Sequence, residues 1–349
     1  MDFALTRAVL DGGLAARAFP AVSIEVGRTS GPLWTWAAGH LTYAPDAPPA
    51  TTDTIFDLAS LTKVIATASF VMRHVTRGTL RLDAPVADYL PSWRDDEHRA
   101  VTIRHLLDHS SGLPAHARLW DRCRDLAEFE LAIHALGLER RPGAKSVYSD
   151  LGFITAGAVL ERSGLPLDRE MRDLAAALDT PTLRYRPLPA WGIHIAPTEF
   201  DPWRNRLLQG EVHDENAAAL DGVAGHAGLF GTAADVGVFA RTVLRTFVEG
   251  TVLGDPPLMI RMAAETGVPE SSRALAWDVM RPTSSCGRRL SRNAIGHTGF
   301  TGTSLWIDRD RDLYVVLLTN RVHPSRSNEA LLPIRPRVHD AVVEDCRRT

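Results

Sequence analysis

A serine and a lysine three residues apart, Ser60 and Lys63, lie in the stretch TIFDLASLTKVIATA (54–68). Of the 39 lysine and arginine residues in the chain, only Lys63 and Lys145 are lysines. Residues at i and i+3 share one face of a helix, so this pair is in contact if a helix begins near Ser60. A desolvated lysine can lose its proton and activate a serine hydroxyl, whereas an arginine stays charged. The spacing therefore predicts a serine nucleophile with a lysine base.

The pair alone is weak evidence, because a lysine is usually a solvated surface charge. Two further stretches strengthen it. SVYSDLGF places Tyr148 in a loop ahead of a predicted helix, and AIGHTGFTGTSLWID places His297, Thr298 and Gly299 at the end of a predicted strand. Three such elements in this order along the chain are a far more specific signal than the Ser60–Lys63 pair alone.

In this order along the chain, the motifs S-x-x-K, Y-x-D and H-T-G resemble those of the penicillin-recognising serine hydrolases. That superfamily includes class C β-lactamases, D-alanyl-D-alanine carboxypeptidases and family VIII esterases. The resemblance continues in VTIRHLLDHSSGLPAH (101–116), RPGAKSVYSDLGFITAGAVLE (141–161) and GLFGTAADVGVFAR (228–241). It therefore covers the chain from about residue 15 to residue 320.

The resemblance implies that an ester or amide acylates Ser60 and that water releases the acyl group, with no cofactor and no metal. Lys63 and Tyr148 would share the proton transfers, and which of them is the general base stays open. The backbone N–H groups of Ser60 and Phe300 would form the oxyanion hole. The residues expected to contact the substrate are Asp150, His297, Thr298 and Gly299.

Two of these residues depart from the family pattern. His297 stands where β-lactamases usually carry a lysine, and a histidine with a pKa of ~6.5 is mostly neutral at pH 7. This change favours uncharged esters or amides over β-lactams. Asp150 stands where asparagine is common, and an ionised carboxylate cannot donate to a substrate carbonyl. Asp150 could instead pair with Lys63, raise the pKa of the lysine and shift the base role to Tyr148.

The function implied by the resemblance is a serine hydrolase that forms an acyl-Ser60 intermediate. An esterase ranks first, a D-amino-acid carboxypeptidase or muropeptide hydrolase second and a weak β-lactamase third. The alternative of another class is a non-catalytic relative that binds a ligand or self-assembles, and the three intact motifs argue against it. The expected partner is a small ester, amide or peptidoglycan fragment, while the oligomeric state stays open.

Three features outside the motifs have structural interpretations. The stretch GEVHDENAAALDGVAGHAGLFG (210–231) fits no zinc spacing, so we interpret it as a structural or substrate-lining loop. It also resembles a segment of family members linked to cell-wall muropeptides. His105 and His109 are four residues apart, which predicts one helix face and core or capping roles. Asp57 is expected to cap the helix that carries Ser60.

Periodicity predicts strands at both ends of the chain and helices between them. Strands are expected at 21–28, 33–43, 294–300, 302–308 and 313–320, and terminal helices at 2–17 and 337–348. The fold class is therefore α+β: an antiparallel sheet flanked by terminal helices, with an inserted and mostly helical domain of the β-lactamase/transpeptidase type. Residues 1–58 and 288–349 would form the α/β domain and residues 59–287 the helical one, with the active site in the cleft between them.

Composition narrows the class of protein further. The 349 residues are 45% hydrophobic and carry a formal net charge of −3, which points to neither nucleic acid nor a membrane surface as partner. Three cysteines cannot form a fully paired disulfide framework. The first residues do not follow the pattern of a signal peptide, so a soluble cytoplasmic protein is expected, or a periplasmic one if a leader has been removed.

Overall fold

The computed structural model describes residues 2–348, and its centre is a six-stranded antiparallel sheet with the strand order β2-β1-β11-β10-β9-β8. Strands from both ends of the chain are neighbours in this sheet, since β1 pairs with both β2 and β11. The strands are β1 (Ala21–Arg28), β2 (Gly31–Gly39), β8 (Asp278–Val279), β9 (Ile295–Thr298), β10 (Ser304–Asp308) and β11 (Leu313–Thr319).

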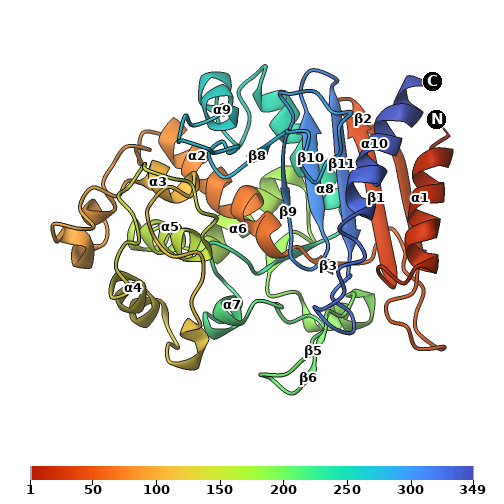
Figure 1. The fold of residues 1–349 in the computed structure, drawn as a ribbon, viewed down its shortest axis with the longest axis horizontal. Coiled ribbons are helices and arrows are strands. Elements are labelled where there is room, and N and C mark those ends of the chain that lie inside the picture. The colour runs from red at the N-terminus through yellow and green to blue at the C-terminus, as the bar shows by residue number, and fades with distance from the viewer. Residues whose placement is uncertain (1, 349) are drawn as a thin grey trace.

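Helices cover both faces of the sheet. The terminal helices α1 (Ala4–Ala15) and α10 (Ile334–Arg347) lie side by side on one face, close to both ends of the chain (Figure 1). Helix α8 (Ala233–Thr246) packs on the opposite face. Alternate residues of β11 point to opposite faces, so Val315 and Leu317 join the cluster with α1 and α10, while Val316 joins the cluster with α8. Because both faces are covered, every residue of β11 is buried and its sequence is a continuous apolar run.

The middle of the chain supplies a helical region beside the sheet (Figure 1). Its helices are α2 (Ser69–Thr76), α3 (Ile103–Leu107), α4 (Leu126–His134), α5 (Asp150–Arg162), α6 (Leu167–Leu178), α7 (Glu215–Ala219) and α9 (Pro256–Ala263). Short strands form two separate small sheets, with the strand orders β3-β7-β4 and β5-β6. Their strands are β3 (Phe56–Asp57), β4 (Arg184–Tyr185), β5 (Phe200–Asp201), β6 (Arg206–Leu207) and β7 (Leu229–Gly231).

Most expected elements are present, and two local expectations are wrong. Helix α3 ends at Leu107, and His109 follows it with a left-handed φ of 60°, so His105 and His109 do not share a helix face. Ser60 lies in a 3₁₀ turn, Ala59–Leu61, which leads into a π-helical segment, Lys63–Ala68, rather than in the first turn of an α-helix. A 3₁₀ turn has three residues per turn, so it still places Ser60 and Lys63 on one side.

The division into 1–58 with 288–349 and 59–287 stays a prediction. Two elements of the 59–287 segment nevertheless belong to the sheet layer, since β8 pairs with β9 and α8 packs on β1 and β11. Within residues 2–348, no helix has the length and apolar character needed to cross a membrane.

A buried ionic contact holds α8 to the sheet. Glu25 of β1 is buried, accepts a hydrogen bond from the Tyr314 hydroxyl (2.7 Å) and pairs with Arg241 of α8 (3.0 Å). Burial raises the pKa of Glu25, although Tyr314 and Arg241 counteract that rise. Gly237 faces the same carboxylate, where a Cβ would lie 1.9 Å from Glu25 Oε1. A Cβ at position 237 would therefore displace the Glu25 carboxylate from this contact.

Replacing Arg241 with methionine is expected to lower the free energy of unfolding by roughly 2–4 kcal/mol, because Glu25 would lose its buried cation. Urea unfolding at pH 7 measures the change. The matched control is Arg245→Met on the same helix, where the side chain is exposed and a change within about 0.5 kcal/mol is expected. Equal effects of the two substitutions would contradict this account.

Candidate active site

The backbone turn that carries Ser60 is held by groups on both sides of it. Ala59 has a left-handed φ of 47°, which is uncommon for a residue with a side chain. The Ala59 N–H donates to Asp57 Oδ1 (2.8 Å), and the Thr303 hydroxyl donates to the carbonyl of Leu58 (3.0 Å). These contacts fix a strained turn that presents the Ser60 side chain to the cleft.

Asp57 connects three segments around this turn. Besides the Ala59 N–H, its carboxylate accepts the N–H of His213 (2.7 Å), and its carbonyl accepts the Thr301 hydroxyl (2.7 Å). Asp57 therefore has a structural role, but it is not the expected helix cap, because the N-cap of the 3₁₀ turn is Leu58 and no side chain caps that turn. Burial raises the pKa of Asp57, while the hydrogen bond from His213 opposes the rise.

Lys63 is fully buried, and its amino group has three acceptors. Nζ donates to Ser60 Oγ (2.8 Å) and to the carbonyl of His226 (3.1 Å), and it forms an ion pair with Asp150 Oδ1 (2.7 Å). Two hydrogen bonds and one ion pair thus surround a group that is most stable here as an ammonium ion. The ion pair between Asp150 and Lys63, which the sequence suggested as an alternative role for Asp150, is therefore present in the structure.

The electrostatics favour the same protonation state. Burial lowers the pKa of Lys63, but attraction by Asp150 and Tyr148 outweighs it, and the pKa lies above its ordinary value. A protonated Lys63 that donates to Ser60 Oγ cannot accept the proton of that hydroxyl. The Ser60 proton is therefore free to point toward another acceptor in the cleft.

Tyr148 is the group that faces both Ser60 and Lys63. Lys63 Nζ lies 4.8 Å from the centre of the Tyr148 ring, and Arg273 lies 5.0 Å from it. Burial raises the pKa of Tyr148, Asp150 raises it further, and the contacts with Lys63 and Ser60 lower it, with a net rise. The phenol is thus mostly protonated at neutral pH, and its deprotonated fraction grows as the pH rises.

His109 packs against the Tyr148 ring and holds the backbone on both sides of it. Its ring lies 4.6 Å from the Tyr148 ring, its Nδ1 accepts the Ser149 N–H (3.0 Å), and its carbonyl accepts the Val147 N–H (2.8 Å). Burial and nearby cations hold the pKa of His109 well below its ordinary value, so the ring is neutral. The core role expected for His109 is confirmed. His105 and Thr102 form reciprocal hydrogen bonds that cap the N-terminus of α3. The capping role that the sequence offered for His105 is therefore confirmed.

The predicted oxyanion hole consists of two backbone N–H groups, those of Ser60 and Phe300. Ser60 and Phe300 both line the cleft, and among residues 2–348 neither N–H group donates to another protein atom. Gly299 makes this approach possible, because a Cβ there would lie 2.0 Å from Thr303 Oγ1 and 2.6 Å from the Leu58 carbonyl. The close contact that requires glycine is therefore with the Ser60 turn itself.

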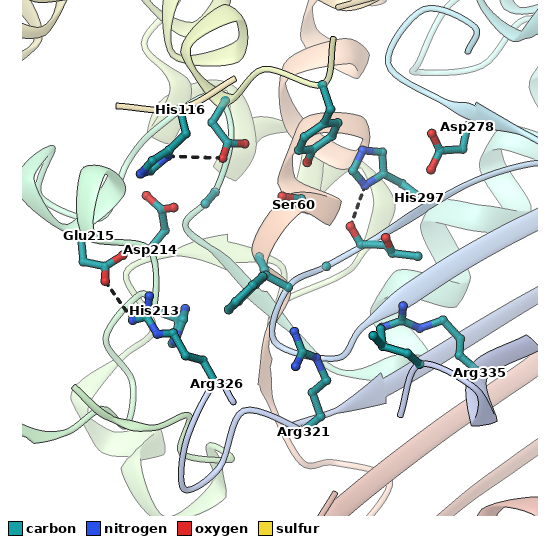
Figure 2. Close-up of a pocket in the computed structure, with 18 of the residues that line it drawn as sticks. Ser60, His116, His213, Asp214, Glu215, Asp278, His297, Arg321, Arg326 and Arg335 are labelled. Carbon is teal, nitrogen blue, oxygen red and sulfur yellow. Dashed lines mark hydrogen bonds and ion pairs between the residues drawn. The ribbon is translucent and has the colours of Figure 1, made fainter. Parts of the chain in front are cut away.

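His297 lies on β9, buried at the wall of the cleft (Figure 2). Nδ1 donates to the carbonyl of Thr298 (2.8 Å), which leaves the lone pair on Nε2 without a protein donor in the described chain. Burial together with the charges of Lys63 and Arg273 holds the pKa of His297 well below its ordinary value. The expectation of a neutral histidine is supported. Asp150, Thr298 and Gly299 line the same cleft.

The cleft has a volume of about 540 Å³ and contains charged residues that the sequence motifs did not identify. Arg321 and Arg335 lie on one side of Ser60, and Asp214 and Glu215 on another (Figure 2). Arg273 completes the set and pairs with Asp278. No short motif marks these arginines, because each comes from a different segment and only the fold brings them together.

The 210–231 loop lines the cleft with His213, Asp214, Glu215 and Ala227, which agrees with its interpretation as a substrate-lining loop. Asp214 pairs with His226 (2.7 Å), and the His226 carbonyl accepts from Lys63. One group of potential metal ligands lies elsewhere in residues 2–348: Asp95, His98 and His134. Both imidazoles contact the Asp95 carboxylate, at 3.0 Å and 2.7 Å, and these hydrogen bonds account for the arrangement without an ion.

Comparisons with known proteins agree on one family. The sequence profile described as Beta-lactamase matches residues 6–335. A putative D-alanyl-D-alanine carboxypeptidase of Escherichia coli (strain K12) is 31% identical over 317 residues, which cover 78% of this chain and 70% of the relative. The N-acetylmuramyl-L-alanine amidase of Bacillus subtilis (strain 168) is 33% identical over 311 residues, covering 78% of this chain and 69% of the amidase.

A solved structure supports the fold. The penicillin-binding protein homologue of Caulobacter crescentus superposes with a TM-score of 0.77 at 19% identity, covering 97% of this chain and 96% of the homologue. The predicted fold class, including its β-lactamase/transpeptidase type, is therefore confirmed.

The geometry predicts how pH governs the reactivity of Ser60. The reactive state has one proton fewer on the Lys63–Tyr148–Asp150 cluster, and the pKa values of both Lys63 and Tyr148 are raised. Labelling of Ser60 by a fluorophosphonate should therefore accelerate as the pH rises through an alkaline midpoint. Asp150→Asn removes the negative charge that raises both pKa values, so the midpoint should move to lower pH.

A cleft carboxylate that does not contact Lys63 provides the control. Glu215 pairs with Arg326 (2.8 Å), so Glu215→Gln should leave the midpoint where it is in the wild type. A midpoint that stays unchanged in Asp150→Asn would show that Asp150 does not control the protonation of this cluster.

Proposed function

The chain belongs to the beta-lactamase family, and from this premise we propose that it is a serine hydrolase that cleaves an amide of a peptidoglycan fragment through an acyl-Ser60 intermediate. The observation that carries the proposal is the contact of Ser60 Oγ with the Lys63 ammonium beside the backbone N–H groups of Ser60 and Phe300, which donate to no protein atom in residues 2–348. A buried cation beside a serine hydroxyl, together with two N–H groups that can stabilise an anion, is an arrangement that serves acyl transfer. Ligand binding alone does not require it.

Acylation begins with attack of Ser60 Oγ on the substrate carbonyl. Deprotonated Tyr148 accepts the Ser60 proton, while the Lys63 ammonium stabilises the negative charge on the phenolate and on the attacking oxygen. The oxygen of the tetrahedral intermediate binds the N–H groups of Ser60 and Phe300, each worth roughly 3–4 kcal/mol in such sites. Tyr148 then donates the proton to the leaving nitrogen, and the C–N bond breaks.

Deacylation repeats the same steps with water as the nucleophile. Tyr148, again deprotonated after the amine has left, removes a proton from water, and the hydroxide adds to the acyl carbonyl. The Ser60–acyl bond breaks, and Ser60 Oγ recovers its proton from Tyr148. In this scheme Lys63 stays charged throughout, and the general base is Tyr148.

The substrate class is supported by the relatives and by the charge of the cleft. Two relatives above 30% identity are named as a carboxypeptidase for D-alanyl-D-alanine and an amidase for N-acetylmuramyl-L-alanine. The preference for uncharged substrates followed from the neutral His297, but Arg321 and Arg335 supply positive charge from elsewhere in the cleft. We therefore place amides of charged cell-wall fragments ahead of esters.

Ester hydrolysis is the second candidate. The specific observation in its favour is the neutral His297 at the position of the third motif, which removes one fixed charge from the path of an apolar acyl group. Because the attack on an ester and on an amide uses the same oxyanion hole, activated esters should be turned over even if amides are the natural substrates.

Ser60 and Lys63 are tested by substitution. Ser60→Ala should abolish labelling by a fluorophosphonate and turnover of p-nitrophenyl acetate. Lys63→Arg should lower turnover by roughly 10²–10⁴-fold, because a planar guanidinium cannot direct three N–H groups as the ammonium does. Lys145→Arg is the matched control, since Lys145 is half exposed and pairs with Glu270 at the surface. Unlabelled wild-type protein would favour the ligand-binding alternative instead.

The substrate class needs a separate comparison. N-acetylmuramyl-L-alanine, an acyl-D-alanyl-D-alanine peptide, p-nitrophenyl acetate and nitrocefin should be tested against wild type and Ser60→Ala. We expect one of the two amides to have a higher kcat/KM than nitrocefin and to lose it in Ser60→Ala. Turnover of p-nitrophenyl acetate with no hydrolysis of either amide would favour the esterase.

A further inference from the structure

His226 has two polar contacts, one through its backbone and one through its side chain. Its carbonyl accepts a hydrogen bond from Lys63 Nζ (3.1 Å), and its Nε2 lies 2.7 Å from Asp214 Oδ1. The residue is only 1% exposed, so solvent does not compete for either contact. Nδ1 has no partner within residues 2–348, so the proton that holds the ring in place is the one on Nε2, which is donated to Asp214.

Asp214 is fixed at the other end of this contact. Its Oδ1 also accepts the N–H of Ala217 (2.8 Å) and thereby caps the N-terminus of α7. Burial raises the pKa of Asp214, but the contact with His226 and the charge of Lys63 outweigh that rise, and the pKa lies well below its ordinary value. An ionised carboxylate is a strong hydrogen-bond acceptor, so Asp214 anchors the His226 ring to the start of α7.

The backbone around His226 has few other anchors. The carbonyl of the preceding Gly225 accepts a threonine hydroxyl (2.6 Å), and the N–H of Leu229 donates to another (3.1 Å). Between these two bonds, the backbone groups of His226 and Ala227 form no hydrogen bond with another backbone group of residues 2–348. The side chain of His226 is therefore the tether that keeps this stretch against the Lys63 ammonium.

We infer that Asp214 and His226 form a positioning pair for Lys63: the hydrogen bond between their side chains holds the His226 carbonyl where it accepts from the ammonium group. Both residues lie outside the three sequence motifs, and His226 itself is not among the residues that line the cleft. The pair thus acts on the reaction through Lys63, whose other side meets Asp150 and Tyr148. The inference rests on the proposed function only for the reaction that the ammonium serves.

Because the chain has only two lysines, the state of Lys63 can be measured without turnover. Protein labelled with ¹³C at the lysine Cε atoms gives one NMR signal each for Lys63 and Lys145, and Lys145→Arg assigns them. His226→Leu removes the donor to Asp214 and keeps an apolar side chain of similar size. The Lys63 signal should then titrate at least about one pH unit lower than in the wild type, because the released carbonyl no longer stabilises the charged form. A Lys63 signal that keeps the wild-type titration overturns the inference.

Two further variants separate positioning from stability. His226→Gln is the conservative change, because the glutamine amide can still donate to Asp214, and it should keep the wild-type titration of Lys63. His98→Leu is the matched control, since His98 is a buried histidine whose Nδ1 contacts the Asp95 carboxylate (3.0 Å) in another part of the chain. Equal shifts of the Lys63 titration in His98→Leu and His226→Leu would assign the effect to a general loss of stability and overturn the inference.

Asp214 tests the contact from its other end. Its side chain is 23% exposed, so replacement is tolerated better than at His226, and Asp214→Ala carries the test alone if His226→Leu does not fold. Asp214→Ala should lower the Lys63 midpoint as His226→Leu does, and the double variant should add little, because both changes remove one hydrogen bond. Asp214→Asn keeps an acceptor for Nε2–H, so its shift should be clearly smaller. Equal shifts in the Asn and Ala variants would show that Asp214 acts through its charge and would overturn the positioning role.

Labelling of Ser60 by a fluorophosphonate, measured on the same samples, distinguishes this inference from the proposed function. A displaced ammonium should lower the maximal labelling rate of His226→Leu about tenfold or more, and His226→Gln should restore most of it. A labelled wild type whose rate is unchanged in His226→Leu rejects the positioning pair alone. A wild type that is never labelled, together with the shifted Lys63 titration in His226→Leu, rejects the proposed reaction alone.

Discussion

The buried ammonium of Lys63 is the interaction on which the site depends. It donates hydrogen bonds to Ser60 and to the His226 carbonyl and forms an ion pair with Asp150, and these three partners come from different segments of the chain. A buried lysine is stable as a charged group only if such partners surround it. The same partners that keep Lys63 charged also direct its ammonium group toward Ser60 Oγ, so the charge and the position of Lys63 have one cause.

Much of the remaining architecture serves to hold these acceptors and the oxyanion donors in place. Asp57 connects the Ser60 turn to the 213 and 301 segments, and Gly299 allows the β9–β10 connection to contact that turn. The sheet contributes rigidity, since residues of β9 and β10 are buried in the apolar clusters on both faces of the sheet. A site built from a strained turn and a strand end keeps its geometry because neither can shift without breaking buried contacts.

Part of the charge of the cleft comes from residues outside the three sequence motifs. The third motif presents a neutral His297, whereas Arg321 and Arg335 contribute positive charge to the surrounding wall. Arg273 and Arg326 have carboxylate partners, whereas Arg321 and Arg335 have none in the described structure. An evaluation of substrate charge from the motif residue alone therefore misses the main source of positive charge.

The sequence by itself determined the strands at both ends, the α+β class and the motif residues, because apolar periodicity and i, i+3 spacing are local properties of a chain. It also indicated that Asp150 could hold the proton on Lys63. Only the tertiary structure decided that Ser60 lies in a 3₁₀ turn, that His109 supports Tyr148 and that two arginines remain unpaired in the cleft. Each of these features depends on contacts between segments that are far apart in the sequence. The free energy of a buried group is determined by its neighbours in space, and separation along the chain does not predict which residues those are.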